Sequence, residues 1–122
     1  MNKPVYFNKL VRDKIPEIIS KNGSNPTIKV LNGEEYKIAI FEKLKEECAE
    51  VISAENKEHL TEELADLFEV IHSIIKNQDI TFEEIEKVRL SKKEKRGGFD
   101  EKIFLISSEK VNLGGVTNWV KN

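Results

Sequence analysis

Apolar residues recur at intervals of three and four along most of the chain, which is the period of an amphipathic helix. The most regular stretch covers residues 57–76. Its apolar positions, which we expect to be buried, are Leu60, Leu64, Leu67, Phe68, Ile71, Ile74 and Ile75. The same reasoning, with the start and stop signals below, predicts helices at about residues 13–21, 32–54, 57–76 and 81–97. The fold is therefore expected to be mainly α.

Local capping signals mark where these helices begin. Asn32 and Glu35 have the spacing of a capping box, in which each side chain hydrogen-bonds the backbone N–H of the other residue. Thr81 and Glu84 repeat this pattern at the fourth helix. Asp13 is the expected N-cap of the first helix.

The remaining segments suggest how the helices are connected. Residues 27–31 and 102–108 are short and β-branched, so we expect them to pair as a small two-stranded β element. The turn between the second and third helices is short, which should make these helices antiparallel neighbours. The breaks that contain proline or glycine are also short. We therefore expect residues 1–122 to form a single domain, an antiparallel helical bundle with that β element.

Composition narrows the function classes. The 20 basic and 22 acidic residues give a formal charge of −2, which argues against a nucleic acid polymer as partner. The chain has neither a signal-peptide core nor the roughly 18 consecutive apolar residues of a membrane helix, so we expect a cytoplasmic protein with no membrane partner.

The single cysteine, Cys48, excludes an intramolecular disulfide and is expected to be a small core residue. His59 and His72 lack the spacing of metal ligands and are expected to be surface or satisfied residues.

Acidic residues cluster in matching patterns on the two long expected helices. Glu47 and Glu50 are three residues apart on one helix, with Glu46 beside them. Glu63 and Asp66 repeat the interval on the next helix. At about 100° per residue these positions flank the apolar stripes, so antiparallel pairing would point the two matching pairs at one cleft.

A cleft lined by four carboxylates needs counter-charge, because neighbouring like charges raise one another's pKa. A hard divalent cation would supply it. Ligation by oxygen alone favours Mg²⁺ or Mn²⁺ over zinc, and Mg²⁺ also binds substrate phosphate oxygens. The pattern therefore indicates phosphate-ester or phosphoanhydride chemistry. The alternative is that these residues are solvated acids on amphipathic helices, as most glutamates are.

The string Glu46-Glu47-x-x-Glu50, followed after twelve residues by Glu63-x-x-Asp66, resembles the E-E-x-x-E…E-x-x-D signature of the all-α nucleotide pyrophosphohydrolase superfamily. This superfamily includes MazG, dimeric dUTPases and phosphoribosyl-ATP pyrophosphohydrolase. The resemblance implies hydrolysis of a nucleoside triphosphate between its α and β phosphates, giving a monophosphate and pyrophosphate. It implies that Mg²⁺, or else Mn²⁺, is held by Glu47, Glu50, Glu63 and Asp66. Glu46 would be a further ligand or would orient the attacking water, so the expected catalytic residues are Glu46, Glu47 and Glu50.

The flanking sequences extend this resemblance over nearly the whole chain. YFNKLVRDKIPEII (residues 6–19) and KRGGF (residues 95–99) are similar to the ends of a small bacterial and archaeal MazG-like subfamily. That subfamily is described as phosphoribosyl-ATP pyrophosphohydrolase-like, or as house-cleaning enzymes that remove non-canonical nucleotides.

One rival function is that of a true phosphoribosyl-ATP pyrophosphohydrolase of histidine biosynthesis, which cleaves the same bond in another nucleotide. Another rival is a non-catalytic helical interaction module, whose acidic stripe binds a basic partner.

Basic residues near both ends of the chain are candidates for binding substrate phosphates. These are Lys9 and Arg12 near the N-terminus, and Lys93, Lys95 and Arg96 at the end of the fourth expected helix. The alternative for the second group is that basic residues in a last helical turn stabilise the helix dipole without any ligand.

The expected bundle is thin, because two long helices and a few short elements bury little surface. Related enzymes complete their bundle or active site across subunits. We therefore expect a homodimer or a higher homo-oligomer.

Overall fold

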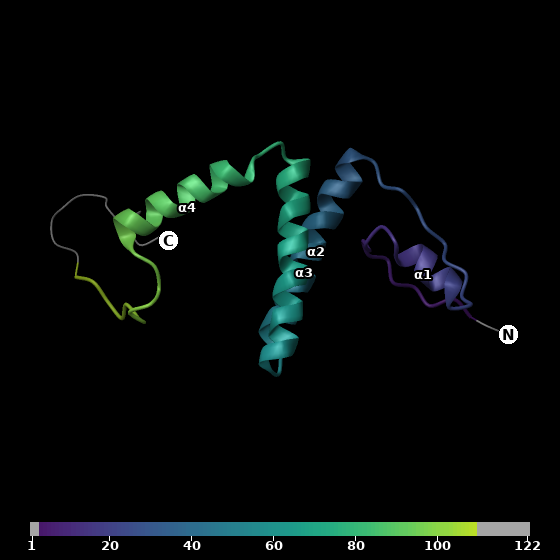
Figure 1. Ribbon diagram of the computed structural model, residues 1–122, viewed down its shortest axis with the longest axis horizontal. Helices are drawn as coiled ribbons and strands as arrows, with labels where there is room; N and C mark the ends of the chain where they lie inside the picture. Colours follow the sequence, from purple (N-terminus) through teal and green to yellow (C-terminus); the bar gives the residue numbers. More distant parts are fainter. Residues whose placement is uncertain (1–2, 110–122) are drawn as a thin grey trace. The chain divides into compact units, whose positions relative to one another are not determined.

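The computed structural model describes residues 3–109 of the chain. Within this range the structure is mainly helical, with four helices (Figure 1). They are α1 (Ile15–Lys21), α2 (Gly33–Ser53), α3 (Lys57–Asn77) and α4 (Phe82–Arg96). All four predicted helices are therefore confirmed. The chain divides into two compact units, residues 1–81 and 82–122.

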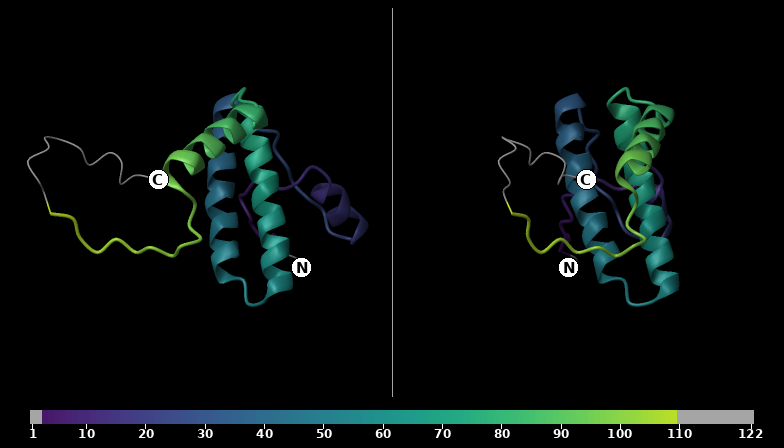
Figure 2. Two further views of the ribbon diagram at one scale, coloured as in Figure 1. Left: turned by 60° about the vertical axis from the view of Figure 1, so that its left-hand side comes forward. Right: turned by 90° about the vertical axis from the view of Figure 1, so that its left-hand side faces the viewer.

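The centre of the first unit is a hairpin of α2 and α3, which lie side by side and antiparallel (Figure 2). Three residues connect the two helices, and Asn56 caps α3 by accepting a hydrogen bond from the His59 backbone N–H at 2.8 Å. The small core consists of Ile40 from α2 with Val70 and Ile75 from α3. The predicted antiparallel pairing is confirmed, and it sets the two acidic helices against each other.

The start of α2 follows the predicted capping box. The Glu35 backbone N–H donates to Asn32 Oδ1 at 2.9 Å, and the Asn32 backbone N–H donates to Glu35 Oε1 at 3.2 Å. These bonds satisfy two of the backbone groups that a helix leaves unpaired at its start.

The start of α1 differs from the prediction. Its N-cap is Lys14 instead of Asp13, and no side chain caps the helix. A turn precedes the helix, with the Ile15 N–H donating to the Arg12 carbonyl at 3.0 Å, and Lys14 has helical backbone angles. An N-cap side chain usually acts from an extended residue, and Lys14 lacks that conformation. The helix ends as expected before Gly23, whose φ of +90° suits a residue without Cβ.

The predicted β element was wrong. Residues 27–31 and 102–108 are both within the described part of the chain, and neither forms a strand. Their apolar side chains are largely exposed, as Val30 and Phe104 show. β-propensity mainly reflects how well a side chain packs on a half-buried sheet, and two strands alone are marginally stable. Without such a surface, the β-branched pattern does not produce pairing.

Burial on the helix pair is also lower than the sequence predicted. Leu60, Leu64 and Phe68 were expected in the core but are exposed, Phe68 by 61%. Cys48, expected as a small core residue, is exposed as well. Two packed helices can bury only the stripe that faces the partner, so apolar residues on the flanks remain at the surface.

In the second unit, α4 starts directly after Thr81, as predicted. It ends at Arg96, and Gly97 follows with a φ of +84°, which is typical of a helix C-cap glycine. Among the described residues no helix combines the length and apolar character needed to cross a membrane. The expectation that residues 1–122 form one domain stays a prediction.

Candidate functional site

Three carboxylates from the helix pair meet on one side of the first unit: Glu47 from α2, and Glu63 and Asp66 from α3. One oxygen of each lies within 4.8 Å of the others. Glu63 and Asp66 are three residues apart and so lie on the same side of α3. The packing of α2 against α3 places Glu47 opposite them. The structure thus brings together three of the four predicted metal ligands.

Glu47 is the most enclosed member of this group. It is only 8% exposed, and it is the one charged residue buried within the described part of the chain. Burial raises the pKa of Glu47, and the negative charges of Asp66, Glu46 and Glu63 raise it further, against the opposing effect of Lys43. A buried carboxylate among like charges is a group that a bound cation would stabilise.

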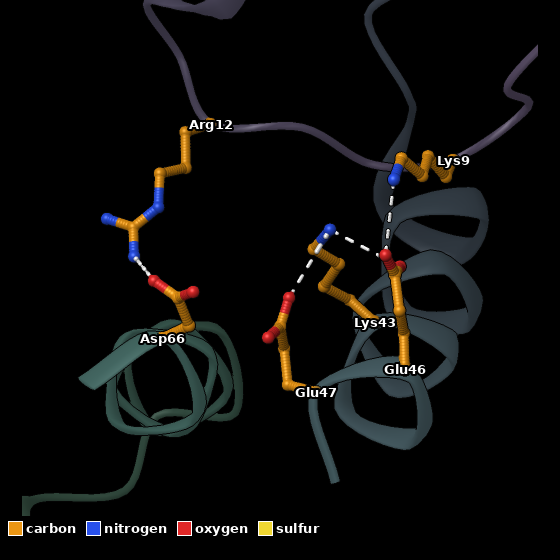
Figure 3. A network of polar contacts seen from close by, with 6 residues as sticks. All are labelled: Lys9, Arg12, Lys43, Glu46, Glu47 and Asp66. Carbon is orange, nitrogen blue, oxygen red and sulfur yellow. Dashed lines mark hydrogen bonds and ion pairs between the residues drawn. The ribbon is translucent and has the colours of Figure 1, made fainter. Parts of the chain in front are cut away.

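Glu46, the neighbour of Glu47, is held between two lysines (Figure 3). Lys9 Nζ lies 3.2 Å from Glu46 Oε1, and Lys43 Nζ lies 3.3 Å from Glu46 Oε2. Lys43 Nζ is also 3.6 Å from Glu47 Oε1. Burial raises the pKa of Glu46, but the hydrogen bonds from Lys9 and Lys43 outweigh it, so the net pKa is lowered. Glu46 therefore remains a carboxylate at neutral pH.

Asp66 and Glu63 have basic side chains beside them as well. Arg12 Nη2 donates to Asp66 Oδ1 at 2.8 Å, from the segment that precedes α1 (Figure 3). His59 Nε2 lies 3.4 Å from Glu63 Oε1, one helical turn away on α3. Lys43 is the corresponding partner of Glu47. Each member of the group of three carboxylates is thus close to one basic side chain.

The group of three carboxylates fits a small hard cation. Mg²⁺ binds oxygen at about 2.0–2.1 Å, so two ligands of one ion lie at most about 4.2 Å apart. The three oxygens lie within 4.8 Å of one another, so the side chains would draw closer together to share one ion. The donors are all carboxylate oxygens, which suit Mg²⁺ or Mn²⁺ better than softer metals.

Comparison with known proteins supports the same chemistry. The model of the phosphoribosyl-ATP pyrophosphohydrolase family matches residues 6–91, which include the group of three carboxylates, Lys9 and Arg12. The chain belongs to this family. Members of this family are described as phosphoribosyl-ATP pyrophosphohydrolases.

One curated protein that is similar to this chain comes from Mycolicibacterium smegmatis and is described as an uncharacterized protein. It is 45% identical over 49 residues, which cover 40% of this chain and 50% of the relative. The match therefore spans half the length of the relative. No solved structure matches the chain significantly.

Other site residues that the sequence predicted for this chain lie outside the group of three carboxylates. Glu50 is exposed on α2, about 60° around the helix from Glu47. Its role as fourth ligand stays a prediction. Lys93, Lys95 and Arg96 are exposed in the last turn of α4, in the second unit and beyond the region matched to the family. Their role in binding phosphate also stays a prediction.

Sequence reasoning missed Lys43 as a member of the site. Lys43 precedes Glu47 by four residues and Glu46 by three, a spacing that places its ammonium beside both carboxylates on a helix. That spacing was the available signal. His59 was expected to be a surface or satisfied residue, and its contact with Glu63 agrees with the second description.

Proposed function

We propose that this chain is a Mg²⁺-dependent nucleoside triphosphate pyrophosphohydrolase that cleaves between the α and β phosphates. The products are a nucleoside monophosphate and pyrophosphate. The observation that carries this proposal is the convergence of Glu47, Glu63 and Asp66 within 4.8 Å, in a chain of the phosphoribosyl-ATP pyrophosphohydrolase family. Mn²⁺ is the second metal that the donor set suits.

Glu47, Glu63 and Asp66 would hold the ion, with Glu50 as a fourth ligand. When bound, the ion neutralises charge on phosphate oxygens and lowers the pKa of a coordinated water. The carboxylates would fix the position of the ion, and the oxygen that leaves phosphorus gains negative charge during cleavage.

Glu46 is suited to orient the attacking water. It stands next to Glu47 and outside the group of three carboxylates, and its lowered pKa keeps it ionised. The water oxygen forms a bond to phosphorus while the bond from phosphorus to the oxygen bridging the α and β phosphates breaks. The Glu46 carboxylate accepts a hydrogen bond from that water and can take up its proton.

Cationic side chains bind the substrate phosphates. Arg12 and Lys9 are close to Asp66 and Glu46, so phosphates bound beside the metal would lie within reach of both side chains. A guanidinium suits this role because its donors match two phosphate oxygens at once. Lys93, Lys95 and Arg96 are proposed as further phosphate contacts on the strength of their clustered charge alone.

The physiological substrate is proposed to be a non-canonical nucleotide, which makes the enzyme a house-cleaning pyrophosphohydrolase. The family match favours a second candidate, phosphoribosyl-ATP, the substrate after which the family is described. Both substrates present the same bond and require the same metal. They differ in the nucleoside part attached to the α phosphate. Only an assay with a panel of substrates can therefore decide between them. The expected cytoplasmic location stays a prediction.

The active form is proposed to be a homodimer or a higher homo-oligomer. Only three apolar side chains are buried within the described residues, whereas Ile52 of α2 is 84% exposed and Phe68 of α3 is 61% exposed. A second copy of the helix pair would cover such flanks and complete a bundle.

The test of the activity is an assay of pyrophosphate release in the presence of Mg²⁺ or Mn²⁺. The substrates are canonical nucleotides, modified nucleotides and phosphoribosyl-ATP. The decisive variant is Glu63→Gln, and Glu62→Gln is its matched control, since Glu62 is the exposed neighbour. We expect Glu63→Gln to reduce the rate by at least about 10- to 100-fold and Glu62→Gln to leave it unchanged. Full activity in Glu63→Gln would exclude the metal assignment. No activity of the unmodified protein on any substrate would favour the non-catalytic interaction module.

A further inference from the structure

A hollow of about 1180 Å³ lies in the first unit, next to the proposed metal site. Its walls come from residues 8–13, from residues 27–31 and from the face of α2 between Glu35 and Glu46. Small-molecule sites in proteins typically have volumes of about 300–1,000 Å³. The hollow is therefore large enough for a ligand of nucleotide size.

The lining of this hollow changes in character along α2. Tyr36 and Ala39 line the hollow near the start of the helix with Ile28 from the preceding segment, beside the ion pair of Lys29 and Glu35. Lys43 lies two helical turns beyond Tyr36, on the same face and about 10 Å along the axis. Because Lys43 Nζ is 3.6 Å from Glu47 Oε1, the charged end of the hollow adjoins the group of three carboxylates.

The charged end of the hollow carries basic side chains that suit phosphate, alongside the carboxylates of Glu42 and Glu46. Lys9, Arg12 and Lys43 all line it, and the first two come from the N-terminal segment that faces α2 (Figure 3). In the structure these cations are paired with carboxylates. A metal ion that takes over the carboxylates would release their positive charge for a phosphate bound beside it.

We propose that this hollow binds the nucleoside part of the substrate, with the base against Tyr36 and the phosphates beside Lys43 and Arg12. The inference rests on the proposed function, which it extends by assigning a base site. Tyr36 is half-buried and lines the hollow two helical turns from Lys43, which suits the part of a nucleotide farthest from its phosphates. Stacking on an aromatic ring is tolerant of base identity, so this contact suits an enzyme that accepts several nucleotides.

The test measures binding of a non-hydrolysable α,β-methylene nucleoside triphosphate by calorimetry in the presence of Mn²⁺. Tyr36→Ala removes the ring, Tyr36→Phe retains it, and Tyr6→Ala is a matched control at an exposed tyrosine outside the hollow. Removal of a stacking ring costs about 1–3 kcal/mol per base, which corresponds to at least about a fivefold rise in Kd. We expect that rise for Tyr36→Ala only, while Mn²⁺ alone binds all three variants as it binds the unmodified protein.

A second variant keeps the proposal falsifiable if Tyr36→Ala fails to fold. Ala39→Leu adds volume inside the hollow and keeps a residue of high helix propensity, and it should also raise the Kd of the analogue at least fivefold, by about 1 kcal/mol. An unchanged Kd for the analogue in Tyr36→Ala or in Ala39→Leu, with pyrophosphate release intact, would overturn the base site and leave the proposed function standing. Absence of both analogue binding and pyrophosphate release in the unmodified protein would overturn the proposed function, and the base site with it. A second copy of the chain could instead cover the hollow, and the Kd of the analogue would then rise with protein concentration. That result would also overturn the proposal.

Discussion

Arg12 Nη2 lies 2.8 Å from Asp66 Oδ1, although the two residues are 54 positions apart in the chain. This ion pair ties the segment before α1 to a proposed metal ligand on α3. Asp66 therefore has two possible cationic partners, the guanidinium and a divalent ion. The same Arg12 is proposed to contact phosphate, so the pair links metal binding to substrate binding.

The Arg12→Ala substitution should strengthen metal binding and weaken substrate binding. A cation that binds Asp66 must displace the guanidinium, and exposed ion pairs contribute about 0–1 kcal/mol, so the Kd for Mn²⁺ should fall by up to about fivefold. The KM for the nucleotide should rise because a phosphate contact is lost. Lys21→Ala is the charge-matched control, since Lys21 pairs with Glu17 on α1. Equal Mn²⁺ affinity in the two variants would show that Arg12 does not compete with the metal.

Millimolar Mg²⁺ or Mn²⁺ should raise the thermal unfolding temperature of the protein. A ligand at about 100 times its Kd stabilises the folded state by about 2.7 kcal/mol, which corresponds to a shift of roughly 5 °C or more for a chain of this length. Differential scanning fluorimetry with EDTA as the reference measures the shift. Glu63→Gln should abolish most of it and Glu62→Gln should keep it. A full shift in Glu63→Gln would mean that the ion binds elsewhere.

Acid should remove a stabilising contribution at the start of α2. The hydrogen bond from the Lys29 ammonium, followed by that from the Asn32 backbone, lowers the pKa of Glu35 below its usual value of 4.5. A group whose pKa is lowered by folding stabilises the protein above its unfolded pKa, and this contribution is lost as the pH falls through the folded pKa.

Glu35→Gln tests this pH dependence, because glutamine preserves the capping box and lacks the charge. The unmodified protein should be more stable than the variant near neutral pH, and the difference should vanish below the lowered pKa. Urea unfolding followed by circular dichroism, between about pH 3 and pH 7, measures it. The neighbouring first-turn substitution Glu34→Gln is the control. A difference that stays constant across this range would contradict the assigned role of the Lys29 contact.

Light scattering at micromolar concentration should give at least twice the 14.1 kDa mass of one chain. Phe68→Glu should shift the protein toward the monomer, because a charge cannot be buried in an apolar contact without a partner. Val30→Glu, at an exposed site outside the helices, serves as the control and should leave the mass unchanged. A monomeric mass for the unmodified protein would exclude the proposed assembly.

The sequence was sufficient to predict the helices and most of their ends. Helical periodicity and capping are local properties, decided by residues three or four apart, and Asn32 with Glu35 illustrates this. The β element failed because pairing depends on a partner strand and on a packed face, which residues 27–31 do not find within the described chain. Asp13 failed as a cap because the backbone of the preceding turn determined where α1 begins.

By itself the sequence also determined which acids could act together, since a three-residue interval places Glu63 and Asp66 on one side of a helix regardless of the rest of the fold. Only the tertiary structure decided that Glu47 joins them while Glu50 is exposed, because that depends on how α2 is rotated against α3. It also decided that Arg12 reaches Asp66 across 54 positions. Such contacts are set by the packing of distant segments, and no local pattern encodes them.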